Sequence, residues 1–297
     1  MKNRIQKIQK YLEGKNIKNK LISKNKSDHL LINGDCDEVM MLLPEKSVDL
    51  IITDPPYNQS LDYGLRFNDN KSWAEYYAWL EQKLSQIPRL LSDKGSFYLI
   101  SYPEINARIL PFLEDRLKLN FRRWITWHYP TNIGHSYKNF TRSQRSILFF
   151  TKRGKGYVFN QKEIIQPYKN PTAPVIKERY RLGYKGRAAY DALGLEDLIE
   201  IDLLKNNSPE RFRNIDSKFV SLDNNKEKLK KIDHPCQLPL SLLELFIKVS
   251  SKSNSVIFDP FAGTFTTSAA AANLGRNSIG VDLNPKFIKF GVKRLKK

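Results

Sequence analysis

The sequence predicts an α/β fold built on a doubly wound, mostly parallel sheet. Short runs rich in β-branched residues, such as 48–53, alternate with stretches whose apolar residues repeat at helical spacing, such as 73–91. Two of the runs end in an acid that is followed by proline, Asp54 and Asp259. Strands and helices that alternate in this way form parallel sheets covered by helices on both faces.

The expected elements of the first half follow in chain order. The run 48–53 predicts a buried strand because β-branched residues fit a pleated sheet. Between Trp73 and Leu91 the apolar spacing predicts an amphipathic helix, which Pro88 should kink or end early. The remaining elements expected before residue 152 are strands at 29–32, 97–100, 121–127 and 146–151 and helices at 39–43 and 104–118.

Residues 152–233 lack this alternation. They are polar and Asn-rich, which indicates an inserted or appended subdomain. Periodicity then returns, and the elements expected after the insertion are a helix at 238–251, a strand at 256–258, a helix at 266–274, a strand at 278–281 and a closing helix after Pro285. At the other end, residues 1–27 carry nine Lys or Arg and one acid, Glu13, which predicts a basic N-terminal arm.

The charge of the chain indicates a polyanionic partner. The formal net charge is +19, and a Lys or Arg that neutralises a phosphate releases condensed counterions. Solvated lysine faces are the alternative, but the charge is clustered. Eleven Lys or Arg lie between Arg116 and Lys162, interleaved with aromatic residues, and no acid occurs from Arg116 to Gln161. The candidate DNA contacts are Arg122, Arg123, Lys138, Arg142, Arg145, Arg179, Arg181, Lys185 and Arg187.

Length and composition exclude several classes of protein. The 297 residues suffice for one large domain or a catalytic core with an insertion. No apolar run is long enough to cross a bilayer, and the N terminus lacks a signal peptide, so no membrane partner and a cytoplasmic location are expected. The two cysteines, Cys36 and Cys236, are far apart and predict neither a disulfide framework nor a metal site.

Two strand ends near the C terminus form a nucleotide-binding pattern. The strand 255–258 ends at Asp259 and a Gly-containing turn, before a small-residue helix whose free N–H groups favour an anion. The next strand ends at Asp282, where a carboxylate can accept hydrogen bonds from both hydroxyls of a ribose. Together they predict a nucleoside-containing cofactor. The alternatives are a helix-capping role for Asp259 and a surface-loop role for Asp282.

The segment Asp54-Pro55-Pro56-Tyr57 lies at the strand edge where open α/β sheets bind ligands. The exocyclic amine of a base is a poor nucleophile because its lone pair is delocalised. The Asp54 carboxylate and a proline carbonyl can accept hydrogen bonds from its two N–H groups, and the negative charge stabilises the positive charge that develops as the amine attacks a methyl group. Tyr57 can stack on a base that has left the duplex. The alternative is an Asp-Pro turn with a core tyrosine.

Together these motifs resemble the S-adenosylmethionine-dependent DNA amino-methyltransferases. The segments 53–58 and 258–264 carry the resemblance, and their order is similar to that of the permuted β group of the family. Further similar segments are 33–35, 124–127, 146–152, 234–239 and 275–280. The resemblance implies a Rossmann-like methyltransferase fold in which a catalytic half, 28–151, and a cofactor-binding half, 234–297, flank a target-recognition region at 152–233. It also implies S-adenosyl-L-methionine as methyl donor and no metal.

The resemblance assigns roles to the residues of the catalytic half. Asp54 and the Pro55 carbonyl would bind the target amine, Pro56 would complete the motif, and Tyr57 would stack on the flipped base. Asp54 is also expected to lie beside the cofactor.

Further roles concern the cofactor. Asp282 would bind the ribose, and His234 belongs to a segment that enters the cofactor site, although a loop histidine that contacts the backbone is an equal alternative. The residues expected near the adenine are Asp35 and Cys36, and those expected near the methionine part are Asp259, Pro260, Phe261, Gly263 and Thr264.

The chain departs from the family pattern at two places. The cofactor loop of the family usually has a second glycine where this chain has Phe265, and a glycine permits positive φ or close backbone approach. Either the loop keeps an ordinary conformation with the Phe265 ring in the core, or cofactor binding is weakened; retained activity is expected. The second departure is Gln144-Arg145, where relatives often show an acid before the strand.

The sequence therefore predicts a site-specific DNA methyltransferase that acts on N6 of adenine in duplex DNA, with base flipping, within a restriction-modification system. An aspartate rather than a serine before Pro55 favours adenine over cytosine-N4. The alternatives are a cytosine-N4 enzyme, an RNA methyltransferase and a DNA-binding relative whose catalysis is impaired by Phe265. Double-stranded DNA is the expected partner, and the sequence leaves open the recognition sequence, a cognate restriction endonuclease and a homodimer.

Overall fold

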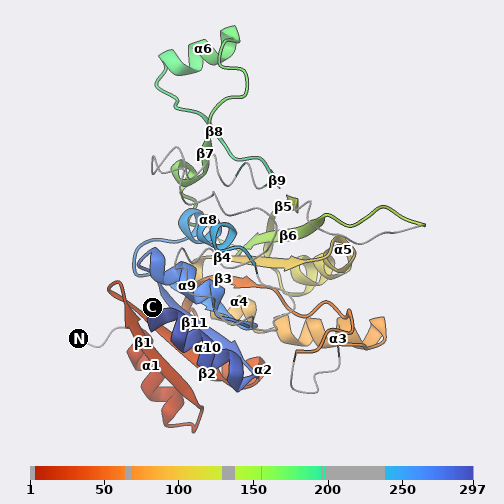
Figure 1. The fold of residues 1–297 in the computed structure, drawn as a ribbon, viewed down its shortest axis with the longest axis vertical. Helices are drawn as coiled ribbons and strands as arrows, with labels where there is room; N and C mark the ends of the chain where they lie inside the picture. The colour runs from red at the N-terminus through yellow and green to blue at the C-terminus, as the bar shows by residue number, and fades with distance from the viewer. Residues whose placement is uncertain are drawn as a thin grey trace.

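The structure, a computed structural model, describes residues 4–63, 69–128, 138–154, 156–194, 197 and 238–296. Its centre is a nine-stranded sheet of order β1-β2-β11-β10-β3-β4-β6-β5-β9 (Figure 1). The strands of this sheet are β1 Asn19–Lys24, β2 Ser27–Asn33, β3 Val48–Thr53, β4 Leu91–Ser101, β5 Asn120–His128, β6 Gln144–Thr151, β9 Ala192–Leu193, β10 Val256–Asp259 and β11 Asn277–Asp282. A separate pair joins β7 Ile165–Gln166 to β8 Arg187–Ala188.

Helices cover both faces of the sheet. On one face, α1 to α5 pack on the side chains of Leu30, Ile51 and Phe97, and on the other α8 and α9 pack on those of Leu50, Ile52 and Tyr98. The helices are α1 Arg4–Glu13, α2 Cys36–Leu42, α3 Trp73–Leu84, α4 Ile87–Leu90, α5 Pro103–Pro111, α6 Pro174–Arg181, α8 Leu240–Ser250, α9 Thr266–Asn273 and α10 Pro285–Lys296, with a π-helical turn at Phe112–Arg116 and a 3₁₀ turn at Gln161–Ile164. The predicted doubly wound α/β fold is confirmed.

The last two strands of the chain lie between strands of its first third. β10 pairs in parallel with β3, and β11 pairs in parallel with β2, with Asp282 opposite Asn33. Strands β2, β11, β10, β3 and β4 are parallel, so their carboxyl ends lie at one edge of the sheet. Asp54 and Asp259, 205 positions apart in the chain, therefore follow adjacent strands.

Most predicted elements have the expected positions. Helix α3 begins with a capping box between Ser72 and Glu75, and it ends at Leu84 before the short α4 that contains Pro88, as the proline predicts. The helix expected over 104–118 is shorter, because α5 ends at Pro111 and the chain continues as a π-helical turn. Within the described residues, no helix is long and apolar enough to cross a bilayer.

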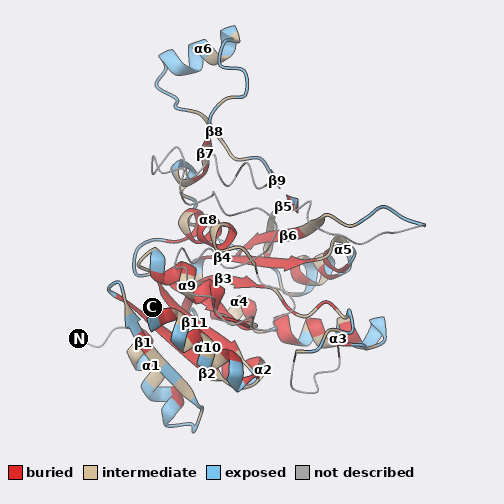
Figure 2. Ribbon diagram, in the orientation of Figure 1, coloured by how far each residue is buried: buried red, intermediate tan, exposed pale blue. Residues whose placement is uncertain are grey.

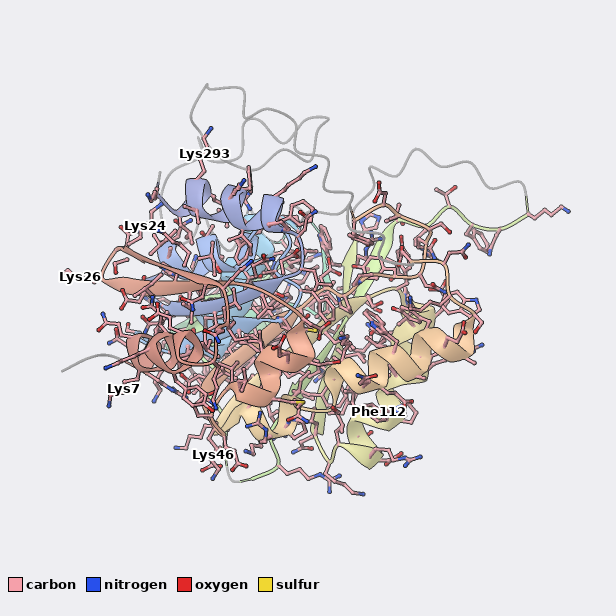
Figure 3. All side chains as sticks on the ribbon, turned by 90° about the horizontal axis from the view of Figure 1, so that it is seen from below. Lys7, Lys24, Lys26, Lys46, Phe112 and Lys293 are labelled. Carbon is pink, nitrogen blue, oxygen red and sulfur yellow. The ribbon has the colours of Figure 1, made fainter. Side chains whose placement is uncertain are left out.

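The basic N-terminal segment packs on the sheet, whereas the sequence predicted residues 1–27 to be an arm. Ile5, Ile8 and Leu12 of α1 are buried against the sheet, and β1 forms its edge by antiparallel pairing with β2. These three residues recur at helical spacing, a pattern that the lysines between them obscure. The lysines stay outside, and Lys7, Lys24 and Lys26 lie at the periphery in Figure 3.

Phe265 has a left-handed backbone, with φ 59° and ψ 36°, although it is not a glycine. The expectation of an ordinary loop conformation with the ring in the core is confirmed for the ring and wrong for the backbone; the alternative, weakened cofactor binding, stays a prediction. The ring is fully buried, and the chain leaves room for it with glycines. A Cβ atom at Gly280 would lie 2.7 Å from Phe265 Cε1, and one at Gly291 would lie 2.5 Å from Phe265 Cδ2. The ring thus occupies space that two missing side chains provide.

We expect Gly291→Ala to destabilise the protein, although alanine normally favours a helix over glycine. The clash with a fully buried ring costs about 1–3 kcal/mol, against a gain in helix propensity of about 1 kcal/mol. Urea denaturation should show a lower free energy of unfolding, and the loss should shrink in a Phe265→Gly background. Gly14→Ala is the control, because its Cβ atom would lie 3.4 Å from the nearest atom. Equal losses in both backgrounds would contradict the packing argument.

Candidate active site

A cavity opens at the carboxyl edge of the parallel strands, between the ends of β2, β3, β10 and β11. It brings together twelve of the residues predicted from the sequence to be catalytic or to bind the cofactor. They are Asp35, Cys36, Asp54, Pro55, Pro56, Tyr57, Asp259, Pro260, Phe261, Gly263, Thr264 and Asp282. His234 lies outside the described residues.

The Asp54 motif is fixed by aromatic side chains. The Tyr57 hydroxyl donates a hydrogen bond to Asp54 Oδ1, and the Tyr76 hydroxyl of α3 donates to the Pro56 carbonyl at 2.8 Å. The Tyr57 ring is buried and lies 4.7 Å, centroid to centroid, from the ring of Tyr102. Both proline φ angles are restricted by their rings. The backbone that carries Asp54 is therefore held from both sides.

Asp259 organises the loop between β10 and α9. Its Oδ1 accepts from the Phe261 N–H at 3.1 Å, and its Oδ2 accepts from the Thr267 hydroxyl at 2.6 Å. From the other side, Arg294 of α10 donates to the Thr264 carbonyl at 2.9 Å. Asp259 therefore bonds to the loop and to the Thr267 side chain while it lines the cavity; the helix-capping alternative is wrong, because α9 has Phe265 at its N-cap and no side-chain cap.

Asp282 joins the end of β11 to the same loop. Its Oδ2 accepts from the Gly263 N–H at 2.9 Å, and its Oδ1 accepts from the Asn284 N–H at 2.7 Å. The positive φ of Gly263, 49°, turns this N–H toward the carboxylate. Asn284 Nδ2 in turn donates to the Tyr63 carbonyl at 3.1 Å, which ties the loop after Asp54 to the cofactor half.

The cavity therefore contains three carboxylates, of which Asp259 is buried and Asp54 and Asp282 are half-buried. Burial raises the pKa of Asp54 to about 7, that of Asp259 to about 6 and that of Asp282 to about 7, because a desolvated carboxylate favours its protonated form. Hydrogen bonds from Tyr57, Thr267 and the backbone oppose this effect. Such a site binds a cation or a diol better than an anion, because both satisfy the carboxylate oxygens.

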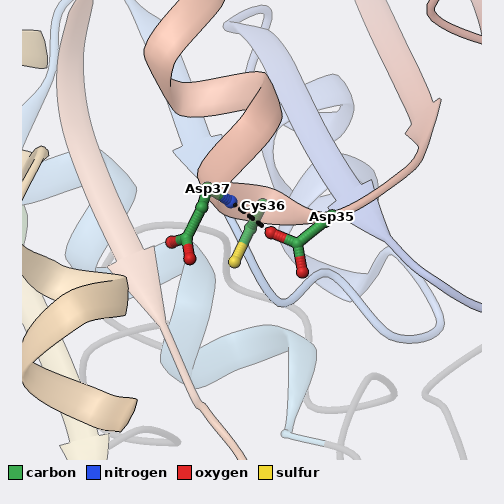
Figure 4. Close-up of side chains that lie close together, drawn as sticks. All are labelled: Asp35, Cys36 and Asp37. Atoms are coloured by element: carbon green, nitrogen blue, oxygen red, sulfur yellow. Dashed lines mark hydrogen bonds between the residues drawn. The ribbon is translucent and has the colours of Figure 1, made fainter. Parts of the chain in front are cut away.

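Asp35, Cys36 and Asp37 form a cluster at the start of α2 (Figure 4). Asp35 caps the helix by accepting from the Asp37 N–H at 2.8 Å. The Lys83 ammonium lies 3.1 Å from Asp35 Oδ1 and 2.8 Å from Asp37 Oδ2 and so supplies the positive charge of the cluster. Burial raises the pKa of the Cys36 thiol to about 12, which keeps it protonated.

The loop that follows Tyr57 is arranged around the buried carboxylate of Asp69. Asp69 Oδ1 accepts from the Asn58 N–H at 2.9 Å, and Oδ2 accepts from the Gln59 and Leu61 N–H groups at 3.0 Å each. The Asn58 side chain also bonds to the backbone of Lys71 in both directions, at 2.7 and 2.8 Å. One aspartate therefore closes the loop that begins at the catalytic motif.

The predicted DNA contacts separate into three groups. Arg142 and Arg145 lie beside the Asp54 motif, both over the ring of Tyr102. Four lie on or after the exposed α6, and they are Arg179, Arg181, Lys185 and Arg187, the last over Tyr190 at 3.3 Å. Three lie on or after β5: Arg122 stacks on Tyr157, Arg123 pairs with Asp191 at 3.4 Å, and Lys138 is exposed. The contacts of Arg122 turn it toward the protein rather than outward.

Sequence reasoning missed several residues of the cavity wall. Trp79 of α3 lies 5.8 Å from Phe261, centroid to centroid, and Lys83 lies one helical turn further on. Both lie on the amphipathic helix α3, whose pattern predicted packing on the sheet and gave no sign of a binding site. Asn284 had a detectable signal, because an Asp-Leu-Asn-Pro sequence is typical of a helix start at Pro285.

In this fold a Rossmann-like sheet presents a carboxylate-Pro-Pro-aromatic motif beside a cavity suited to a nucleoside-containing cofactor. This combination is typical of a class of methyltransferases. The chain matches the DNA methylase family model, N6_N4_Mtase, over residues 48–293. It belongs to this family of S-adenosylmethionine-dependent amino-methyltransferases.

Individual relatives cover most of the chain. The type II methyltransferase M.HpaI of Haemophilus parainfluenzae is 29% identical over 90% of this chain and 74% of its own. The DNA adenine methyltransferase YhdJ of Escherichia coli strain K12 is 28% identical over 89% and 82%. Among solved structures, the cytosine-N4-specific PvuII DNA methyltransferase has a TM-score of 0.64 at 18% identity and covers 93% of this chain and 90% of its own, which shows a shared fold.

We expect Asp69→Ala to loosen the loop after Tyr57, because three backbone N–H groups lose a charged acceptor, each hydrogen bond of this kind being worth about 1.5–3 kcal/mol. Hydrogen exchange should accelerate at the amides of Asn58, Gln59 and Leu61 and stay unchanged at those of β10. Asp93→Ala, which removes an exposed carboxylate, is the control. Unchanged exchange at the three amides would show that the loop does not depend on Asp69.

Proposed function

We propose that this protein methylates N6 of adenine within a short sequence of duplex DNA, after the base has left the helix. The observation that carries the proposal is the position of Asp54-Pro55-Pro56-Tyr57, directly beside Asp259 and Asp282 in one cavity. The DNA methylase family of the chain supports methyl transfer to an amino group of DNA.

The cavity fits S-adenosyl-L-methionine in its negative charge and in its hydrogen-bond acceptors. Its carboxylates match a molecule that carries an ammonium, a sulfonium and a ribose diol. Asp282 would bind the ribose, Asp35 and Cys36 would lie near the adenine, and Asp259 and the 261–264 loop would lie near the methionine part. When bound, the cofactor supplies an electrophilic methyl group.

The residues of the chain prepare the amine. The Asp54 carboxylate and the Pro55 carbonyl would accept hydrogen bonds from its two N–H groups and fix the nitrogen lone pair toward the methyl group. The negative charge of Asp54 would stabilise the positive charge that develops on nitrogen. The Tyr57 hydroxyl now bonds to Asp54 Oδ1, and base entry would replace that contact while the ring stacks on the base.

Adenine is favoured by Asp54 itself, since a serine before the prolines would suggest cytosine-N4. The relatives point both ways, because YhdJ is named an adenine enzyme and the PvuII enzyme is named cytosine-N4-specific. Modification-sensitive sequencing of DNA from a host that expresses this chain tests the choice. N6-methyladenine at one short motif supports the proposal, and N4-methylcytosine at a motif would replace it with the cytosine alternative.

Helix α6 and the segment after it fit the proposed role in target recognition. No α6 residue is buried, and the helix projects from the body of the protein (Figures 1 and 2). Its basic residues lie among exposed tyrosines, Tyr180 and Tyr184, a composition suited to phosphates and bases. The assignment of 152–233 as a target-recognition region stays a prediction, and residues 198–233 lie outside the described residues.

We further propose that the enzyme belongs to a restriction-modification system, since M.HpaI is named a type II methyltransferase. A cognate restriction endonuclease would then cut the same sequence when it is unmethylated. The partner endonuclease and a homodimer both stay predictions.

We expect Asp54→Ala to reduce methyl transfer at least about 10³-fold, because it removes both an acceptor of the amine and the charge that stabilises the transition state. Transfer of labelled methyl groups to duplex DNA measures the rate, and a DNA-binding assay should show affinity within a few-fold of wild type. Near-normal turnover by this variant would refute the proposed mechanism.

Asp282→Ala should weaken S-adenosyl-L-methionine binding by about 10- to 100-fold, the size expected for losing charged hydrogen bonds of about 1.5–3 kcal/mol. Calorimetric titration measures the affinity, with the exposed Asp93→Ala variant as control. If wild-type protein itself fails to bind the cofactor while DNA binding is intact, the impaired-relative alternative is correct and Phe265 is the residue to revert.

A further inference from the structure

Arg145 lies one aromatic ring away from Asp54. Its guanidinium carbon is 5.0 Å from the centroid of the Tyr57 ring and 4.4 Å from that of the Tyr102 ring. The hydroxyl of the same Tyr57 donates to Asp54. Arg145 is half-buried at the second position of β6, where strand pairing of Ser146 with Ser101 places it beside the carboxyl end of β4. A sheet strand, not a surface loop, therefore fixes the position of this cation.

We propose that Arg145 is a positioning residue for methyl transfer, whose guanidinium, held on the Tyr57 and Tyr102 rings, stabilises the ionised form of the Asp54 carboxylate and so extends the pH range in which the enzyme works to lower pH. The inference rests on the proposed function, because it assumes that Asp54 acts on the target amine. It differs from a phosphate contact, the role that the sequence suggested for Arg145.

Within the part of the chain that the structure describes, the other charged and titratable groups around Asp54 do not supply this positive charge. On the next strand end Asp259 carries the same sign as Asp54, and Tyr76 on α3 is neutral because burial raises its pKa. Arg142, which also lies over the Tyr102 ring, is paired with Glu104 at 2.8 Å. Lys83, across the cavity, is paired with Asp35 and Asp37. Arg145 is the cation whose field opposes the burial of Asp54.

The direction in which removal of Arg145 shifts the pH profile follows from the groups that raise and lower the pKa of Asp54. Burial raises the pKa of Asp54, and the Tyr57 hydrogen bond and the charge of Arg145 lower it only in part, so that the resulting pKa is about 7. A protonated Asp54 lacks the negative charge that stabilises the transition state, so activity is lost as the pH falls through this pKa. Removal of Arg145 raises the pKa further and moves the loss of activity to higher pH. A neighbouring cation lowers the pKa of a carboxylate because it favours the charged form.

The test is the pH profile of single-turnover methyl transfer between pH 5.5 and 9, at saturating cofactor and DNA. Arg145→Gln removes the charge, Arg145→Lys keeps it, and Arg142→Gln removes a charge that Glu104 already neutralises. For Arg145→Gln we expect the acid-side midpoint to rise by about one unit. The rate then falls about fivefold at pH 7 and is close to wild type at pH 9. The midpoint should stay near its wild-type value in Arg145→Lys and Arg142→Gln, whatever their absolute rates.

Each outcome decides the inference. A rate loss of equal size at every pH in Arg145→Gln would overturn it and indicate a DNA contact or a structural role, and thermal melting identifies a variant that fails to fold. Equal midpoint shifts in Arg145→Gln and Arg142→Gln would overturn it as well, because the effect would then be a general one of net charge. A carboxyl ¹³C NMR titration, with Asp54→Asn to assign the signal, gives a second reading of the same shift without turnover.

The activity of Asp54→Ala distinguishes a wrong role for Arg145 from a wrong proposed function. If Asp54→Ala retains near-normal activity, the proposed function fails and the pH profile has no bearing on Asp54. If Asp54→Ala is inactive and the midpoint of Arg145→Gln is unchanged, the proposed function stands and the role given to Arg145 is wrong.

Discussion

The insertion of β10 and β11 between β2 and β3 is the constraint on which the site depends. Because parallel strands end at one edge, this order places Asp54 beside Asp259 and Asp282 beside the start of α2. The Asp49 side chain supports the same arrangement from the other edge, since it accepts from the Val256 N–H at 2.9 Å and pairs with Arg4 of α1. The basic N-terminal segment, the first strands and the last strands are therefore parts of one unit.

Periodicity and strand-end chemistry were sufficient to predict the sheet, its two helical layers and the two halves of the site. Asp54, Asp259 and Asp282 could be named because each follows a β-branched run and precedes a turn. A buried Phe265 ring was among the expectations, but the place where it packs could not be predicted, because Gly280 and Gly291 lie near it only in the folded chain. Lys83 and Asp69 were missed for a related reason: a lysine in an amphipathic helix and an aspartate in a polar loop are ordinary until their distant partners are known.

The carboxylates of the candidate active site differ in the groups that stabilise their charge. Three carboxylates lie in one cavity, and burial raises the pKa of each. Asp259 and Asp282 are satisfied largely by the loop that they organise, whereas Asp54 depends on a tyrosine hydroxyl and on a cation behind two rings. This difference agrees with their proposed roles, since a residue that binds a cofactor part can be fixed permanently, while Asp54 must exchange its partner for a substrate amine.

The exposure of helix α6 has a consequence for how the sequences of such enzymes can diverge. An eight-residue helix without buried side chains gains little from packing and is marginal alone in water. Because the sheet does not rest on it, substitutions along α6 leave the stability of the catalytic core almost untouched. Under the proposed role of this region in target recognition, new sequence preferences would then accumulate there without compensating changes in the catalytic core. The β7–β8 pair at the base of α6 would be the part to keep unchanged while the helix varies.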